Sequence, residues 1–189
     1  AQKRFDSLLA KEEKNVDLMM AYAEFLLAIE KPADAQPWLE KAHQIQPDAV
    51  QPALALTSLA LSNGDNKRAL GIAQESLAKK PDNPQLLDNL AKVQLAAGDQ
   101  NQALATLAKL VKVRPNSPIP YFKLANAKAA AGDRNGAIES LQKSISIAPT
   151  FVDAYVQLAA IYLKDGKQAE ALGVALALQK QYPKSAAGS

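Results

Sequence analysis

Residues 84–117 read PQLLDNLAKVQLAAGDQNQALATLAKLVKVRPNS, and this stretch decides the fold. Apolar residues recur in two segments at helical spacing, first as Leu87, Leu90, Ala91 and Leu95, then as Ala103, Leu104, Leu107 and Leu110. Gly98 and Asp99 lie between the segments. Glycine accepts the left-handed backbone conformation that ends a helix, and aspartate caps the free N–H groups that open the next one. The stretch therefore predicts two helices joined by a tight turn.

The same arrangement repeats along the whole chain at an interval of 34 residues. Three residue types keep this interval: Pro47, Pro81, Pro115, Pro149 and Pro183; Gly64, Gly98, Gly132 and Gly166; Ala35, Ala69, Ala103, Ala137 and Ala171. A fixed period of this length is typical of proteins built from stacked supersecondary units, because one helix pair cannot bury its hydrophobic face alone. We call the first helix of each unit helix A and the second helix B.

The period sets the unit boundaries that we predict. Residues 1–15 form helix B of a preceding partial unit, five complete units span 16–49, 50–83, 84–117, 118–151 and 152–185, and residues 186–189 begin a further unit. The first segment is assigned to a helix B because Ala1, Phe5 and Leu8 fall at its core positions in this frame. We therefore expect about eleven helices in one continuous array, cut from a protein with more units on both sides.

The repeat resembles the tetratricopeptide repeat (TPR) family over nearly the whole chain. The period is the same, and the small residue of position 8 is present as Ala23, Thr57, Ala91, Ala125 and Ala159. The resemblance implies an all-α, right-handed solenoid of antiparallel helix pairs that binds other proteins and catalyses nothing. Two turns depart from the pattern, since Glu30-Lys31-Pro32 replaces Gly-Asp in the first unit and Lys167 follows Gly166 in the last.

Composition agrees with a non-catalytic interaction protein. The net charge is only +3 and the Lys and Arg residues are scattered, so nucleic acid is not an expected partner. The chain has no Cys, no Gly-rich phosphate loop and a single histidine, His43, which we interpret as a surface residue. We expect no cofactor and no metal. No stretch approaches the 18 apolar residues of a membrane span.

In the TPR family, helix A lines the groove that receives a partner, through positions that include 5 and 9 of each unit. Those positions predict a groove formed by Met20, Glu24, Leu54, Ser58, Asp88, Lys92, Phe122, Asn126 and Val156. We expect an extended or helical protein segment with hydrophobic anchors, held best by Phe122 and Asn126. The alternative is that part of this stripe, including Leu27, Leu61, Leu95 and Leu163, packs against the next helix A. Asp88 and Lys92 could also simply pair with each other.

A narrower resemblance rests on QLAAGD at 94–99 and LALQKQYPKSAAG at 176–188. Both are similar to the TPR lipoproteins that accompany the bacterial exosortase (PEP-CTERM) sorting system. This resemblance implies a cell-envelope or periplasmic location and a link to exopolysaccharide, with the cytoplasm as the alternative. Two other functions stay open: a structural module of polysaccharide export or assembly machinery, and a regulatory repeat region of a larger enzyme.

Overall fold

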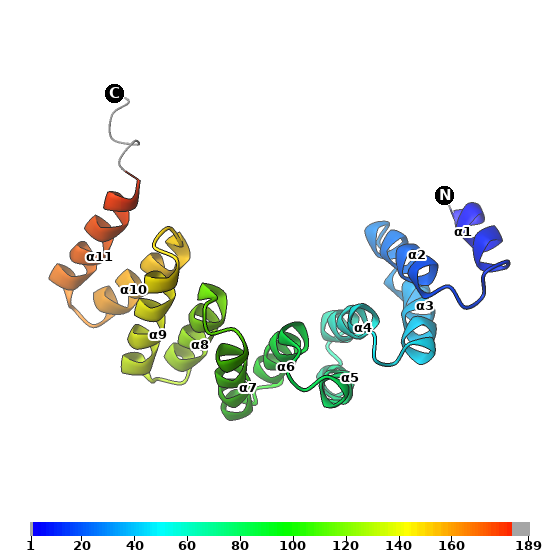
Figure 1. The fold of residues 1–189 in the computed structure, drawn as a ribbon, viewed down its shortest axis with the longest axis horizontal. Helices are drawn as coiled ribbons and strands as arrows, with labels where there is room; N and C mark the ends of the chain where they lie inside the picture. The colour runs from blue at the N-terminus through cyan, green and yellow to red at the C-terminus, as the bar shows by residue number, and fades with distance from the viewer. Residues whose placement is uncertain (1, 183–189) are drawn as a thin grey trace, which may run out of the picture. The chain divides into compact units, whose positions relative to one another are not determined.

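The computed structural model describes residues 2–182, and that part of the chain contains eleven α-helices and no strand. The expected all-α array of antiparallel helix pairs is confirmed. The five helices A are α2 (Val16–Ala28), α4 (Val50–Ser62), α6 (Pro84–Ala96), α8 (Pro118–Ala130) and α10 (Val152–Lys164). The five helices B are α3 (Pro32–Ile45), α5 (Asn66–Lys79), α7 (Gln100–Val113), α9 (Arg134–Ile147) and α11 (Gln168–Gln181). A shorter helix, α1 (Gln2–Leu9), precedes them (Figure 1).

The turns between helix A and helix B have the predicted chemistry. Gly64, Gly98, Gly132 and Gly166 all have positive φ, between 73° and 85°. Glu30 takes the same place in the first turn with φ 58°, a conformation that a side chain makes less favourable. The carboxylate of Asp65 accepts a hydrogen bond from the Arg68 N–H at 3.0 Å, as expected of a helix cap. Lys167 makes no side-chain cap, as its sequence indicated.

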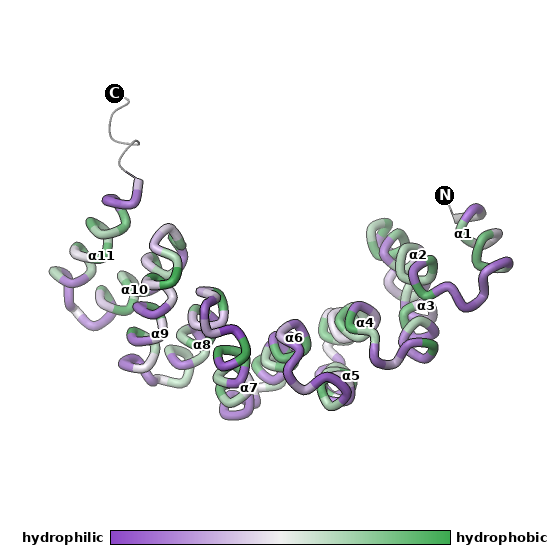
Figure 2. The backbone as a smooth tube through the Cα atoms, viewed as in Figure 1, coloured by the Kyte–Doolittle hydropathy of each residue, from purple (hydrophilic) through white to green (hydrophobic). Residues whose placement is uncertain are grey.

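Hydrophobic residues lie along the helices, while most of the connecting turns are hydrophilic (Figure 2). The chain divides into two compact units, residues 1–99 with α1 to α6 and residues 100–189 with α7 to α11. We call them the N-terminal unit and the C-terminal unit. The predicted beginning of a further repeat at 186–189 lies outside the described residues.

In the N-terminal unit, α2 packs against α3 and α4 against α5, and α4 also contacts α6. One core cluster of this unit contains Met19, Tyr22 and Leu39. The ring of Phe5 in α1 stacks on Tyr22 with centroids 4.9 Å apart, and on Phe25 at 5.6 Å. The ring of Trp38 in α3 packs beside Tyr22, with centroids 5.4 Å apart. Helix α1 is thus attached to the first complete repeat through the ring of Phe5 and through Leu9, which is buried in the same cluster.

In the C-terminal unit, α8 packs against α9 and α10 against α11, and α9 also contacts α10. The buried cluster of this unit contains Ala125, Leu141 and Leu158. The hydroxyl of Ser144 in α9 donates to the carbonyl oxygen of Pro118 at 2.9 Å, which ties helix B to the start of its own helix A. The core of the unit is therefore a layer of small and branched side chains between adjacent helices.

Consecutive repeats are also joined at the ends of their helices B. Lys80 lies 4.0 Å from the carboxylate of Asp48, one repeat earlier in the chain. Three repeats later, at the same positions, the Tyr182 hydroxyl donates to the carbonyl oxygen of Thr150 at 2.8 Å. The 34-residue frame thus keeps the contact while its chemistry changes from an ion pair to a hydrogen bond.

Candidate functional site

The nine residues of the predicted groove all lie on helices A. Eight of them form pairs four residues apart on the same helix, and Val156 stands alone on α10. Side chains four residues apart share one face of a helix, so each pair presents a common surface. The N-terminal unit carries Met20 and Glu24 on α2, Leu54 and Ser58 on α4, and Asp88 and Lys92 on α6. The C-terminal unit carries Phe122 and Asn126 on α8 and Val156 on α10. We call these nine residues the helix A face.

Exposure differs systematically along this face. Glu24, Ser58, Lys92, Asn126 and Val156 are exposed, and Val156 has 57% of its surface accessible to solvent. Met20, Leu54, Asp88 and Phe122 are half-buried. The residue at position 5 therefore packs partly into its repeat in four of the five units, whereas position 9, which is Ala160 in the last unit, is open to solvent in all five.

Phe122 and Met20 belong partly to the core. The ring of Phe122 meets that of Phe151 edge to face, with centroids 5.2 Å apart, and packs against the core of the C-terminal unit. Met20 packs against the core of the N-terminal unit. Asn126, one turn after Phe122, is the more accessible residue of the pair that sequence favoured as an anchor.

The two charged residues of the helix A face on α6 differ in accessibility. Asp88 is half-buried, whereas Lys92, one turn later, is exposed. An exposed ammonium group gains little from a neighbouring carboxylate on the same helix, about 0.2–0.5 kcal/mol. Lys92 therefore supplies a positive charge that the helix A face can offer to a partner.

Leucine occurs at position 12 of four repeats, as Leu27, Leu61, Leu95 and Leu163, and these four side chains fall into two groups. Leu61 is half-buried and packs against a core cluster. Leu27, Leu95 and Leu163 are exposed, and Leu163 has 58% of its surface accessible. Core packing thus explains why residue 61 is apolar, whereas the other three leucines lie at the surface next to the helix A face.

His43 is more buried than we expected from the sequence, which indicated a surface residue. It is half-buried, and its Nδ1 atom is buried without a hydrogen-bond partner among the described residues. Burial lowers the pKa of His43, and the negative charge of Glu75 only partly opposes this effect. The burial arises because α3 contributes to a helical stack, so a helix B residue is partly covered by neighbouring helices.

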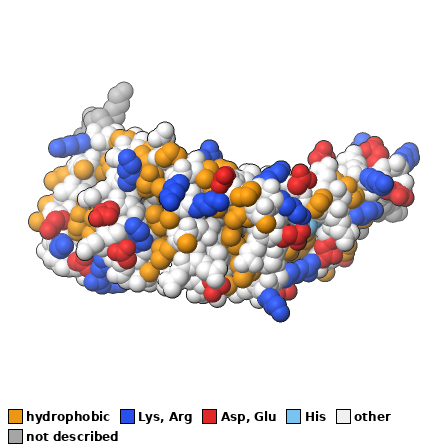
Figure 3. All heavy atoms as spheres, turned by 60° about the horizontal axis from the view of Figure 1, so that its bottom comes forward, with side chains coloured by type: hydrophobic (Ala, Val, Ile, Leu, Met, Phe, Trp, Pro, Cys, Tyr) orange, Lys and Arg blue, Asp and Glu red, His pale blue; other side chains and the backbone are white. Residues whose placement is uncertain are grey.

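Other kinds of site find no support in residues 2–182. No group of three or more potential metal ligands occurs there, and no helix there is both long and apolar enough to cross a bilayer. Charged side chains of both signs are scattered over the face of the molecule in Figure 3, without a continuous basic stripe.

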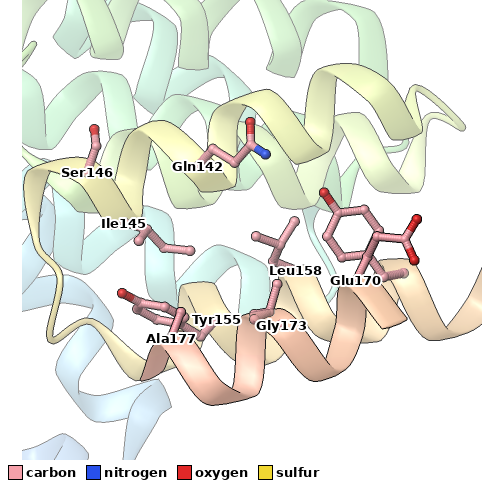
Figure 4. A pocket seen from close by; sticks show the side chains of 10 residues that line it. Gln142, Ile145, Ser146, Tyr155, Leu158, Glu170, Gly173 and Ala177 are labelled. Carbon is pink, nitrogen blue, oxygen red and sulfur yellow. The ribbon is translucent and has the colours of Figure 1, made fainter. Parts of the chain in front are cut away.

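Sequence reasoning missed a pocket of about 390 Å³ in the C-terminal unit, between α9, α10 and α11. Its wall on α9 includes Gln142 and Ile145, and its wall on α11 includes Glu170 and Gly173 (Figure 4). A signal for it exists in the repeat frame, because the position of Ala177 holds a long charged residue in the four preceding units. These are Lys41, Glu75, Lys109 and Lys143.

Known protein families match the chain over residues 60–185. Three family models, each described as a tetratricopeptide repeat, match residues 60–127, 120–151 and 140–185. The chain is a tetratricopeptide repeat protein. TPR proteins of this kind are non-catalytic scaffolds for protein–protein interaction, which agrees with the absence of enzymatic chemistry expected from the sequence.

Several solved TPR structures share this fold. MamA from Desulfovibrio magneticus RS-1 has a TM-score of 0.73 at 18% identity, covering 88% of this chain and 96% of that one. YrrB, described as a TPR protein with an unusual peptide-binding site, has a TM-score of 0.68 at 17% identity, covering 97% and 95%. PilF from Pseudomonas aeruginosa has a TM-score of 0.73 at 17% identity, covering 90% and 78%. At such identities the likeness establishes the fold alone. No curated protein matches the chain.

Proposed function

We propose that this TPR protein binds an extended or helical segment of another protein along its helix A face. The observation that carries the proposal is the composition of what that face exposes. In the C-terminal unit, the large apolar side chains of Val156 and Leu163 are exposed on α10, and the polar side chain of Asn126 is exposed on α8. In the N-terminal unit, the charged side chain of Lys92 is exposed on α6. Exposed apolar side chains next to polar groups are typical of surfaces that bind protein.

Each class of exposed side chain has a role in this proposal. Val156 and Leu163 lie seven residues apart on α10, so both occupy one side of the helix and can bury apolar anchors of the partner. The amide of Asn126 both donates and accepts hydrogen bonds, which suits the main chain of a peptide. Phe122 contributes mainly by holding the surface in place through its contact with Phe151.

Affinity measurements with surface variants test the proposal. Peptides selected from a random displayed library for binding to the protein would be titrated calorimetrically against the wild type, Asn126→Ala and Val156→Asp. We expect Val156→Asp to weaken binding about tenfold or more, because a buried unpaired carboxylate costs at least about 1–3 kcal/mol. Leu172→Asp is the matched control, since Leu172 is an equally exposed apolar residue, 61% accessible, on helix α11.

Retained affinity in both Asn126→Ala and Val156→Asp, together with a loss in Leu172→Asp, would show that the partner binds elsewhere. Loss in the helix A variants alone is the expected result. Circular dichroism of each variant verifies that the helical fold is intact, so that a loss of affinity reports on the surface.

A finer proposal concerns the cellular setting. The sequence resemblance of residues 94–99 and 176–188 supports a bacterial envelope protein linked to exosortase sorting or exopolysaccharide. Neither MamA, YrrB nor PilF is described as such a lipoprotein, so this proposal depends on the sequence resemblance alone. Sequencing the parent gene in both directions and examining its neighbours tests it. A gene far from any exosortase or exopolysaccharide gene would contradict it.

A further inference from the structure

We propose that the pocket between α9, α10 and α11 is a second docking site, which takes a partner segment carrying a bulky apolar side chain and, one helical turn away, an arginine or lysine. The pocket is distinct from the helix A face, because none of the nine residues of that face lines it. Its volume of about 390 Å³ lies within the range of typical ligand pockets.

The floor of the pocket comes from α10. Tyr155 and Leu158 are almost completely buried, and Tyr162, one further turn along, is half-buried. Ile145 of α9 and Val174 of α11 add apolar wall. An apolar side chain of the partner would therefore replace water against aliphatic and aromatic carbon, which is the main source of favourable free energy at such sites.

The pocket is open because α11 carries small residues where a helix B could carry large ones. A Cβ atom added at Gly173 would meet no atom within 4 Å, so nothing in the described part of the chain fills that space. Ala177 replaces the long charged residue found at the equivalent position of the other four complete repeats. Both residues line the wall that faces α9 (Figure 4).

The charge of the occupant follows from Glu170. It is exposed, it is the one ionised residue among those that line the pocket, and no described residue forms an ion pair with it. In Figure 4, Glu170 lies at one end of the pocket, whereas Ala177 and Tyr155 lie at the other. An apolar anchor can thus enter over Leu158 while a basic side chain reaches the carboxylate.

The net charge of the C-terminal unit does not reverse this preference. Residues 100–189 contain eleven Lys and Arg but only five Asp and Glu. At physiological ionic strength, however, charges separated by more than about 8 Å are largely screened. The contact between a partner cation and Glu170 is shorter than that distance, and nearby tyrosine rings attract cations through their faces. The charge of Glu170, and not the net charge of the unit, therefore decides that the preferred partner side chain is positive.

A pair of synthetic peptides tests the proposal. Both are fifteen-residue amphipathic helices with a leucine at the centre of the apolar face; one has arginine a turn away, and the other has glutamate in its place. Titration is followed by backbone amide shifts of the ¹⁵N-labelled protein. We expect the arginine peptide to bind about threefold more tightly or better, because it forms an exposed ion pair with Glu170, whereas the glutamate peptide meets a like charge there.

Two variants and two matched controls locate the binding. Glu170→Gln should abolish the preference for arginine, and Ala177→Lys, which fills the pocket, should abolish binding of both peptides. Glu139→Gln removes an exposed glutamate of α9 that does not line the pocket, and Ala175→Lys adds a lysine to α11 outside it. Both controls should bind as the wild type does.

The proposal is overturned if Glu170→Gln retains the preference, if Ala177→Lys binds as tightly as the wild type, or if neither peptide binds at about 1 mM, the weak limit of useful affinities. Amide shifts confined to the helix A face would also overturn it. Because the two surfaces share no residue, failure here leaves the proposed function of the helix A face intact, and the reverse also holds.

Discussion

The rings of Phe122 and Phe151 meet edge to face at an interplanar angle of 71°. Phe122 lies in α8 and Phe151 is the last residue of the same repeat, directly before α10, so their contact holds the chain that leads into the next repeat of the C-terminal unit. A residue that sequence favoured as a ligand anchor is therefore also a packing residue. Its substitution changes stability as well as any binding.

Phe122→Leu should lower the free energy of unfolding by about 1 kcal/mol, because it keeps most of the apolar surface but loses the aromatic pair. Urea denaturation followed by circular dichroism measures the change. Phe151→Leu removes the same ring contact and should have a similar effect, and the double variant should cost less than the two single changes added together. Additive costs would show that the two rings do not interact.

Gly136→Ala should fail to stabilise α9, although alanine is favoured over glycine inside a helix by about 1 kcal/mol. An added Cβ would lie 2.2 Å from a carboxylate oxygen of Asp133, which must then move. That carboxylate caps the helix by accepting the Gly136 N–H at 2.9 Å, so moving it removes the cap. The loss of about 1 kcal/mol from the cap offsets the gain from alanine.

The matched control is Gly71→Ala in α5, where an added Cβ meets no atom within 4 Å. This variant should raise the free energy of unfolding, measured by thermal or urea denaturation, by about 0.5–1 kcal/mol. The informative quantity is the difference between the two variants. An equal gain in both would mean that the Asp133 cap adapts without cost.

Stability should fall as the pH is lowered from about 7 through the folded pKa of His43. Burial lowers that pKa below the ordinary value of 6.5, so in this range the unfolded chain binds more protons than the folded chain does. His43 is the single histidine of the protein, which makes the effect assignable. Urea midpoints at closely spaced pH values measure it, and His43→Gln should flatten the profile between about pH 7 and the carboxylate range. An unchanged slope in the variant would assign the dependence to other groups.

Phe5→Ala should detach α1 from the rest of the N-terminal unit. The helix has only eight residues, and isolated helices shorter than about 12–15 residues are marginal in water. Its stacking on Tyr22 and Phe25 therefore supplies much of its stability. Hydrogen exchange should accelerate in the amides of α1 while those of α2 and α3 stay protected. Continued protection of α1 would show that other contacts hold it.

The fold was predictable because a 34-residue period fixes both the helices and their turns. The helices A begin at Val16, Val50, Pro84, Pro118 and Val152, which are the unit starts assigned from the sequence. The positive φ of Gly64 and the cap of Asp65 also follow from local chemistry. Such features depend on residues close together in the chain, so pattern alone determines them.

Exposure within the candidate site was less predictable, because it depends on neighbouring repeats. Periodicity places Met20, Phe122 and Val156 at one position, yet only Val156 of these three is exposed, since the other two pack against core clusters. His43 looked like a surface residue because burial by an adjacent helix leaves no local signal. The pocket beside Gly173 arises where three helices meet, so the small Ala177 at a position that is charged in the other repeats was its one signal in the sequence.

Mapping a bound segment on the protein tests the central claim most directly. The ¹⁵N-labelled protein would be titrated with the tightest selected peptide while its amide and side-chain amide signals are recorded. We predict the largest shifts at Asn126 and Val156 and at neighbouring residues of the helices A, with the Asn126 side-chain amide among them. Shifts confined to the helices B, with Asn126 and Val156 unchanged at saturation, would contradict the claim.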